Sequence, residues 1–110
     1  MLNAAERRTD VDTLERVGTA MADGVRRRML VRLLDGPCYP AEFAELLGEG
    51  RPNVSNHLAC LRGCGLVTAT REGRQMRYEL AHRKLERALR LLLEVELIVE
   101  PCHPDLDGRH

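Results

Sequence analysis

The feature that most constrains this chain is a change of hydrophobic spacing in its second half. Between residues 40 and 61 the apolar side chains recur at helical spacing, and the glycines within 48–50 break this stretch into two short helices. From Leu66 the sequence LVTATREGRQMRYEL is rich in Val, Thr and Tyr and turns around Glu72-Gly73, which predicts two antiparallel strands. We therefore expect two helices joined by a tight turn and followed at once by a β-hairpin.

Helical spacing also predicts two helices before this segment and one after it. The five predicted helices cover residues 11–21, 25–34, 40–47, 52–63 and 81–99. In the third of them we expect Phe43, Leu46 and Leu47 to face the core. Helices in this order, with a hairpin after the fourth, describe a winged helix-turn-helix, a mainly α fold of the α+β class. Residues 1–100 are expected to form this single domain, and residues 101–110 a polar tail.

Length and composition set limits on the core and on the location of the protein. The chain has 110 residues, of which 44% are hydrophobic but only 3% aromatic. A domain of this size buries about two thirds of the surface of its unfolded chain, so the aliphatic core is thin and a homodimer is expected. No apolar run approaches the roughly 18 residues of a membrane-spanning helix, and the start MLNAAERRTD lacks the apolar core of a secretion signal. We therefore expect a cytoplasmic protein.

Charge is balanced overall but unevenly distributed. The formal net charge is zero, with 17 basic and 17 acidic side chains. Residues 51–90 hold 9 basic and 3 acidic side chains, a net +6, whereas residues 1–50 carry −2 and residues 91–110 carry −4. A basic centre between acidic ends is typical of a protein that contacts DNA phosphates with one face, although a solvated basic face has the same composition.

The fourth predicted helix carries side chains suited to reading base edges. Four polar residues occupy its first turns, on the side away from its apolar residues: Asn53, Ser55, Asn56 and His57. Asn pairs with adenine and Ser donates or accepts, so these positions suit a helix in the major groove of operator DNA. Helix capping explains Asn53 alone equally well. Five arginines are expected to reach phosphates or the minor groove, from the hairpin and from beside the helix: Arg71, Arg74, Arg77, Arg51 and Arg62.

Cysteine is the other informative residue type. Cys60 and Cys64 are four residues apart on one helix, so their thiols lie one turn apart on one face. Cys102 lies in the polar tail, which has little need for an apolar side chain. Three thiolates favour soft ions such as Cd(II), Pb(II), Hg(II) or As(III), or Zn(II) with a fourth ligand from Cys38, His103 or water. Against this, such a pair is more often part of a core, and Cys38 is expected to be a buried small hydrophobe.

Two stretches of the sequence resemble a known family: LLDGPCYPAEFAELLG and, above all, NVSNHLACLRGCGLVTATREGRQMRYEL. They look like the ArsR/SmtB metal-sensing repressors, and the resemblance covers about residues 12–99. It implies a homodimer paired through its first and last helices, which binds operator DNA when metal-free and releases it when metal binds. The resemblance is strongest to cadmium- and lead-sensing members, and it implies that Cys60, Cys64 and Cys102 bind Cd(II) or Pb(II).

Two other metal sites of that family do not match this chain. The site of the third helix needs a second cysteine where Pro40 stands. The zinc site of the last helix needs an Asp-x-His and a later His-x-x-Glu, whereas this chain has His82 and Lys84, then Val95 and Ile98. The resemblance therefore implies a site on the fourth helix.

Other functions stay open at this point. The same fold with its thiols acting as an oxidation sensor would release DNA on mild peroxide and ignore Cd(II). An enzyme is disfavoured, because the sequence contains no nucleophile elbow, phosphate loop or HExxH motif. A dimerisation or adaptor protein would leave the polar residues of the fourth helix unexplained. The sequence thus predicts a metal-responsive transcriptional repressor whose partners are DNA and a second copy, with no membrane or small-molecule substrate.

Overall fold

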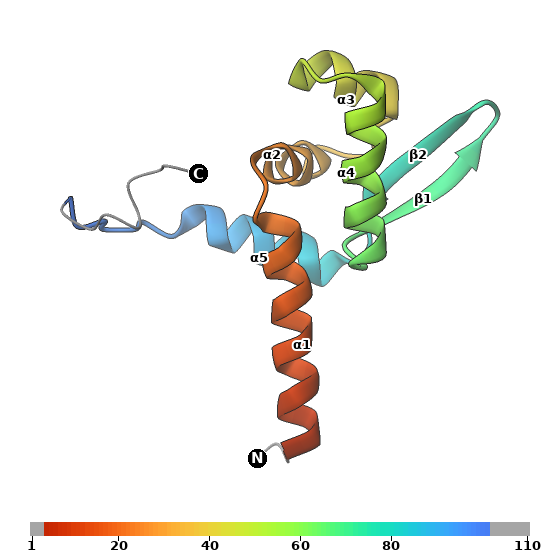
Figure 1. Cartoon of the computed structure of the whole chain (residues 1–110). Helices are drawn as coiled ribbons and strands as arrows, with labels where there is room; N and C mark the ends of the chain where they lie inside the picture. Colours follow the sequence, from red (N-terminus) through yellow and green to blue (C-terminus); the bar gives the residue numbers. More distant parts are fainter. Residues whose placement is uncertain (1–3, 102–110) are drawn as a thin grey trace.

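A computed structural model describes residues 4–101 of the chain. Its elements follow in the order α1 (Ala4–Met21), α2 (Gly24–Leu33), α3 (Pro40–Leu47), α4 (Arg51–Gly63), β1 (Val67–Glu72), β2 (Gln75–Leu80) and α5 (Arg83–Glu94). Helices α2, α3 and α4 pack together, and the hairpin lies beside α4, whereas α1 extends away from them as a long rod (Figure 1). The predicted winged helix-turn-helix is confirmed.

The helix ends follow from local chemistry. The carboxylate of Asp23 accepts hydrogen bonds from the N–H groups of Val25 and Arg26 at 2.8 and 3.1 Å, which starts α2. Helices α3 and α4 each begin with a proline in the first turn, where its missing N–H costs nothing. Gly48 closes α3 in the left-handed region, with φ of 66°, a conformation that favours glycine. These residues place α3 and α4 around a tight turn.

The core is a small aliphatic cluster under α4 and the hairpin. Its fully buried side chains, exposed by less than 2%, are Phe43, Met29, Leu30, Leu58, Leu61, Val54 and Cys38. The prediction for Cys38 is confirmed, because it is fully buried within this cluster. The prediction that Leu46 faces the core is wrong, since 59% of it is exposed. The buried side of α3 runs from Phe43 through Leu47 to Ala44, and at 100° per residue Leu46 lies 60° beyond Phe43 on the other edge.

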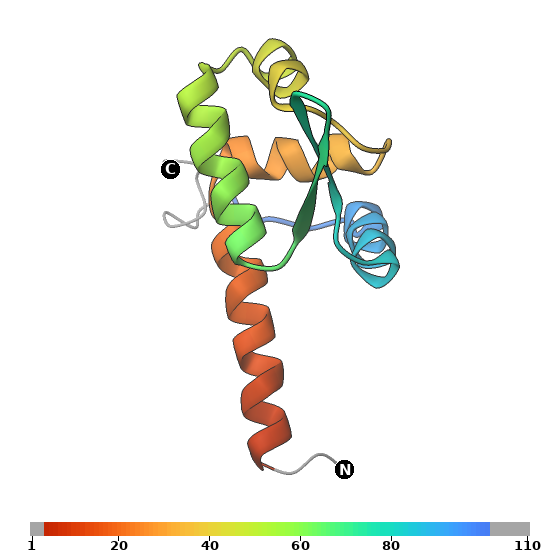
Figure 2. The same cartoon turned by 90° about the vertical axis from the view of Figure 1, so that its right-hand side faces the viewer.

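The hairpin is fixed at its base and projects at its tip. Strands β1 and β2 pair antiparallel from Val67↔Leu80 to Glu72↔Gln75, so Gly73 and Arg74 form the turn. The backbones of Cys38 and Tyr78 exchange two hydrogen bonds of 2.9 Å, which join β2 to the loop before α3. The tip extends away from the helices in Figure 1, and Figure 2 shows the hairpin in front of α2, between α4 and α5. The hairpin is therefore a wing held next to the start of α4.

The two outer helices differ from their predicted lengths. Helix α1 begins at Ala4, well before residue 11, and α5 ends at Glu94 rather than at Val99. Residues 95–99 include β-branched side chains, which lose rotamer freedom in a helix. The large apolar side chains of this segment are 54–98% exposed. Within residues 4–101, these side chains bury too little surface to offset that cost. Within residues 4–101, no helix is both long and apolar enough to cross a membrane.

Candidate nucleic-acid interface and metal centre

Helix α4 turns three of its four predicted base-reading residues outward. Its rotation is fixed by the side chains that it buries: Val54, Leu58 and Leu61. The polar residues on the other side are exposed: Asn53, Ser55 and Asn56. The amide of Asn53 donates a hydrogen bond to Glu49 Oε1 in the turn before the helix. This side of α4 has the short hydrogen-bonding side chains that a major groove accepts.

His57 differs from these three residues. The expectation that it shares their exposed side is wrong, because only 15% of its side chain is exposed. Its ring faces α2, with Nδ1 at 3.3 Å from Arg26 Nη1 and Nε2 at 3.7 Å from Asp23 Oδ2. Helical spacing explains this burial, since His57 is three residues after Val54 and four before Leu61 and so lies on the same side of the helix as these two buried residues.

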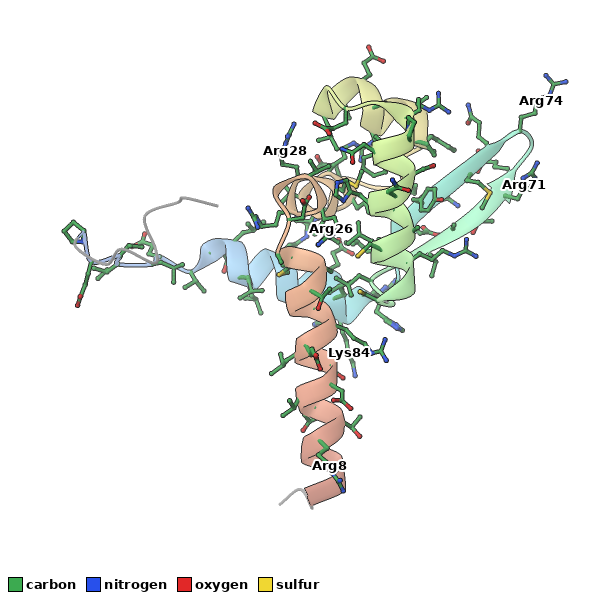
Figure 3. All side chains as sticks on the ribbon, viewed as in Figure 1. Arg8, Arg26, Arg28, Arg71, Arg74 and Lys84 are labelled. Carbon is green, nitrogen blue, oxygen red and sulfur yellow. The ribbon has the colours of Figure 1, made fainter. Side chains whose placement is uncertain are left out.

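The wing presents arginines around its turn. Arg71 and Arg74 are exposed and extend from the far end of the hairpin, away from the core (Figure 3). Arg77 is less free, because Nη2 lies 3.8 Å from Glu79 Oε2. Arg51 and Arg62 are exposed at opposite ends of α4. The structure therefore brings Arg51 and the wing to the same end of α4, and places Arg62 at the other end.

A hollow of about 610 Å³ separates the wing from the first turns of α3 and α4. Arg51 and Ser55 line it from α4, and Arg74 lines it from the wing. Tyr39 also lines it, and its hydroxyl donates a 2.6 Å hydrogen bond to Glu72 Oε1, which raises the pKa of the phenol. Sequence reasoning missed Tyr39, because its partner is 33 residues away. The bond braces the wing against the loop before α3.

Cys60 and Cys64 lie one turn apart at the C-terminal end of α4. Both are free, partly buried thiols, and Cys64 N–H donates to the Cys60 carbonyl at 3.0 Å. Burial raises the pKa of the Cys64 thiol and the neighbouring Cys60 raises it further, whereas the guanidinium groups of Arg16 and Arg26 oppose the shift. The prediction that the pair shares one face is confirmed, since the two thiols are near enough to interact.

The two thiols do not make a complete site within the described residues. Residues 4–101 contain no group of three His, Cys, Asp or Glu side chains that could hold a metal ion. Cys38 is buried in the core, where burial raises the pKa of its thiol. Cys102 and His103 lie outside the described residues. Two soft sulfur donors on one helix face fit a thiophilic ion that takes its remaining ligands from elsewhere.

Comparison with known proteins identifies the family. Residues 23–69, which run from the start of α2 into β1, match the family described as bacterial regulatory protein, arsR family. Over 91 residues the chain is 59% identical to the HTH-type transcriptional regulator CmtR of Mycobacterium tuberculosis, a match that covers 83% of this chain and 77% of CmtR. The chain belongs to the arsR family. Another relative, 42% identical over 72 residues, is a probable mercury resistance operon repressor of Streptomyces lividans, with 66% of this chain and 58% of that protein covered.

Solved structures of arsR-family proteins share the fold. The NMR structure of the cadmium metal-sensor CMTR from Mycobacterium tuberculosis superposes with a TM-score of 0.65 at 57% identity, covering 86% of this chain and 99% of that one. A homodimeric winged helix-turn-helix domain of a possible ArsR-family regulator from Mycobacterium bovis superposes with a TM-score of 0.76 at 30% identity, covering 83% and 84%. The arsR fold thus extends beyond the matched segment to α1 and α5.

Proposed function

We propose that this arsR-family chain is a cytoplasmic, metal-responsive transcriptional repressor. As a metal-free homodimer it binds operator DNA, and it dissociates when Cd(II) or Pb(II) binds Cys60, Cys64 and Cys102. One observation carries the proposal: Cys60 on α4 and Cys64 at its C-cap belong to the same helix that presents Asn53, Ser55 and Asn56 to solvent. A ligand at this position acts directly on the element that would read DNA.

The exposed polar side of α4 and the wing form the DNA-binding surface of the proposal. Asn53, Ser55 and Asn56 contact base edges in the major groove, and a two-fold pair of α4 helices enters successive grooves. Phosphates are contacted by the exposed arginines at the two ends of α4 and on the wing, Arg51, Arg62, Arg71 and Arg74, and by the partly buried Arg77. The net charge of +6 on residues 51–90 supports this assignment.

An unpartnered apolar face supports the homodimer. Leu30, Leu89 and Leu92 line an apolar hollow of about 180 Å³ between α2 and α5. The large apolar side chains of α5 and α1 remain more than half exposed in a single chain: Leu91, Leu92, Leu93, Val11 and Leu14. Large apolar side chains exposed in such number favour an interface with another chain. The homodimeric relative from Mycobacterium bovis agrees with this assignment.

Three thiolates would give the soft site that the proposal needs. Thiolate sulfur favours large polarisable ions over the hard ions that oxygen ligands bind. The cadmium metal-sensor CMTR, 57% identical, supports cadmium, and the relative that is a probable mercury resistance operon repressor agrees with a thiophilic ion. Zn(II), Hg(II) and As(III) are further candidates for the inducing ion. Titrations with each ion distinguish them by the stoichiometry and affinity of binding.

The test is a Cd(II) titration of the reduced protein that follows the thiolate-to-metal charge-transfer band and operator-binding anisotropy on the same samples. We expect a band equivalent to three thiolates per chain that rises as DNA is released. Cys60→Ser, Cys64→Ser and Cys102→Ser should each bind operator and fail to release it. Cys38→Ala is the matched control, because this thiol is buried away from the pair, and it should release DNA normally.

Two outcomes would overturn the proposal. Normal Cd(II)-induced release in all three serine variants would remove these thiols from the switch. Release by mild peroxide without any response to Cd(II) would replace metal binding by thiol oxidation as the signal.

A further inference from the structure

His57 joins the recognition helix α4 to the corner between α1 and α2. Its ring lies between two side chains of that corner, with Arg26 Nη1 at 3.3 Å from Nδ1 and Asp23 Oδ2 at 3.7 Å from Nε2. A guanidinium has no acceptor, so Nδ1 accepts and the proton of the neutral ring is on Nε2, facing the carboxylate. Both ring nitrogens are therefore directed at α2.

The partners of His57 are themselves held firmly. Arg26 donates from Nε to the carbonyl of Ala20 at 3.0 Å and from Nη2 to the carbonyl of Thr19 at 2.9 Å, both in the last turn of α1. Asp23 caps α2 through the N–H groups of Val25 and Arg26. Figure 3 shows Arg26 where α1, α2 and α4 meet. The end of α1, the start of α2 and His57 thus form one hydrogen-bonded unit.

This unit is the polar connection between α4 and the other helices. Within residues 4–101, no other side chain of α4 forms a hydrogen bond or ion pair with α1 or α2, and the remaining contact is made by buried aliphatic residues. The buried side chains decide which side of α4 faces the core, but hydrophobic contact is non-directional and opposes small rotations only weakly. A hydrogen bond with fixed partners specifies one orientation. His57 therefore sets the fine orientation of α4 against the α1–α2 corner.

The thiols lie on the same side of α4 as His57. Cys60 is three residues further along the helix and Cys64 is seven, which is two turns. Arg26 is also near enough to Cys64 to act on its thiol electrostatically. An ion that draws Cys60 and Cys64 toward further ligands therefore pulls on the side of the helix that His57 anchors.

We propose that His57 is a positioning residue for operator binding. Together with Arg26 and Asp23 it holds α4 in the orientation that fits DNA, and metal at Cys60 and Cys64 releases DNA by breaking this contact. The inference rests on the proposed function, and it replaces the role expected of His57 from the sequence, because His57 then acts on DNA through the α1–α2 corner and contacts no base.

Two substitutions break the contact from opposite sides. His57→Leu keeps an aliphatic side chain against the core but removes both ring nitrogens, and Arg26→Met keeps the stem but removes the guanidinium. Arg27→Met is the matched control, because Arg27 also donates to an α1 carbonyl, that of Met21 at 2.7 Å, but is exposed and, within residues 4–101, forms no hydrogen bond with α4. Operator affinity is measured by anisotropy with and without saturating Cd(II), and the charge-transfer band is recorded for each dimer.

His57→Leu and Arg26→Met should each weaken metal-free operator binding by about tenfold and leave the affinity of the Cd(II)-loaded form nearly unchanged. The ratio of metal-free to Cd(II)-loaded operator affinity then falls toward one, while the thiolate-to-metal charge-transfer band is retained. The double variant should be no weaker than either single variant, because all three lack the same contact. His57→Gln, whose amide oxygen accepts from Arg26, should have an affinity ratio between those of His57→Leu and the wild type. Arg27→Met should have the wild-type ratio.

Three results would overturn the inference. The first is a wild-type affinity ratio in His57→Leu or Arg26→Met. The second is an equal loss of affinity in both metal states, which indicates a merely structural role. The third is weakened binding in His57→Leu alone, which indicates a base contact. A wild-type protein that gives no band or no Cd(II)-induced release would instead refute the proposed function, so the two failures are distinguishable.

Discussion

The exposed leucines of α5 allow a quantitative test of the homodimer. Leu92 is 56% exposed and Leu93 is 62% exposed in a single chain. Truncating leucine to alanine removes three carbons, and full burial of each carbon stabilises by about 0.8 kcal/mol. Scaled by the exposed fraction, each truncation costs about 1.4 kcal/mol of association. A two-fold interface contains each residue twice, so Leu92→Ala with Leu93→Ala should cost about 5–6 kcal/mol, an upper value because contact energies at interfaces are not additive.

This energy corresponds to an increase in the dimer dissociation constant of up to about four decades, and we expect at least a hundredfold. Sedimentation equilibrium over a dilution series measures the constant directly. Leu46→Ala is the control, because Leu46 is 59% exposed but lies on α3, away from this face. An increase smaller than tenfold in the double variant, or an equal one in the control, would refute the assignment of the α5 face to the dimer.

Three further predictions concern DNA binding, stability and pH. Arg74→Gln, at the turn of the wing, should weaken binding of all DNA sequences alike and reduce the slope of log affinity against log salt by about 1. Arg8→Gln, at the far end of α1, should change neither the affinity nor the slope. DNA titrations between low and physiological salt measure both. Leu58→Ala should lower the free energy of unfolding by about 2–5 kcal/mol, because Leu58 is 1% exposed, and urea denaturation compares it with the exposed Thr70→Ala. The hydrogen bond from the N–H of Arg26 lowers the pKa of Asp23 below 3.8. The stabilisation from its carboxylate is therefore complete above that value and is lost as pH falls through the lowered pKa. Asp23→Asn, which keeps a capping oxygen, should make the free energy of unfolding depend less on pH over this range.

Local signals predict the parts of the fold that local chemistry determines. Pro40 and Gly48 mark both ends of α3 in the sequence, and the structure uses them there as first-turn proline and left-handed cap. The wing is likewise marked by Gly73, whose φ is 62° in the turn. The C-terminal end of α5 has no such mark before Pro101. Its apolar residues continue at helical spacing beyond Glu94, and whether they remain helical depends on what packs against them.

The candidate site is less predictable, because it joins residues that are far apart in sequence. Spacing alone places Cys60 and Cys64 on one helix face, and the structure agrees. The orientation of His57 depends on Arg26, 31 residues earlier, and on the cap of a different helix. No pattern within α4 contains that information. The spacing of His57 from Val54 and Leu61, which are both buried, predicts only that it is partly buried.

The position of the thiols has a thermodynamic consequence for the proposed switch. The proposed base-reading residues, the proposed anchor His57 and the thiols of Cys60 and Cys64 all lie within residues 53–64, so no long-range pathway between two sites is needed. Coupling between two ligands of one protein is reciprocal: if Cd(II) weakens operator binding by a given factor, operator weakens Cd(II) binding by the same factor. A single helix that can satisfy either DNA or metal in one orientation produces this antagonism, and the strength of the His57 contact then sets how strongly one ligand excludes the other.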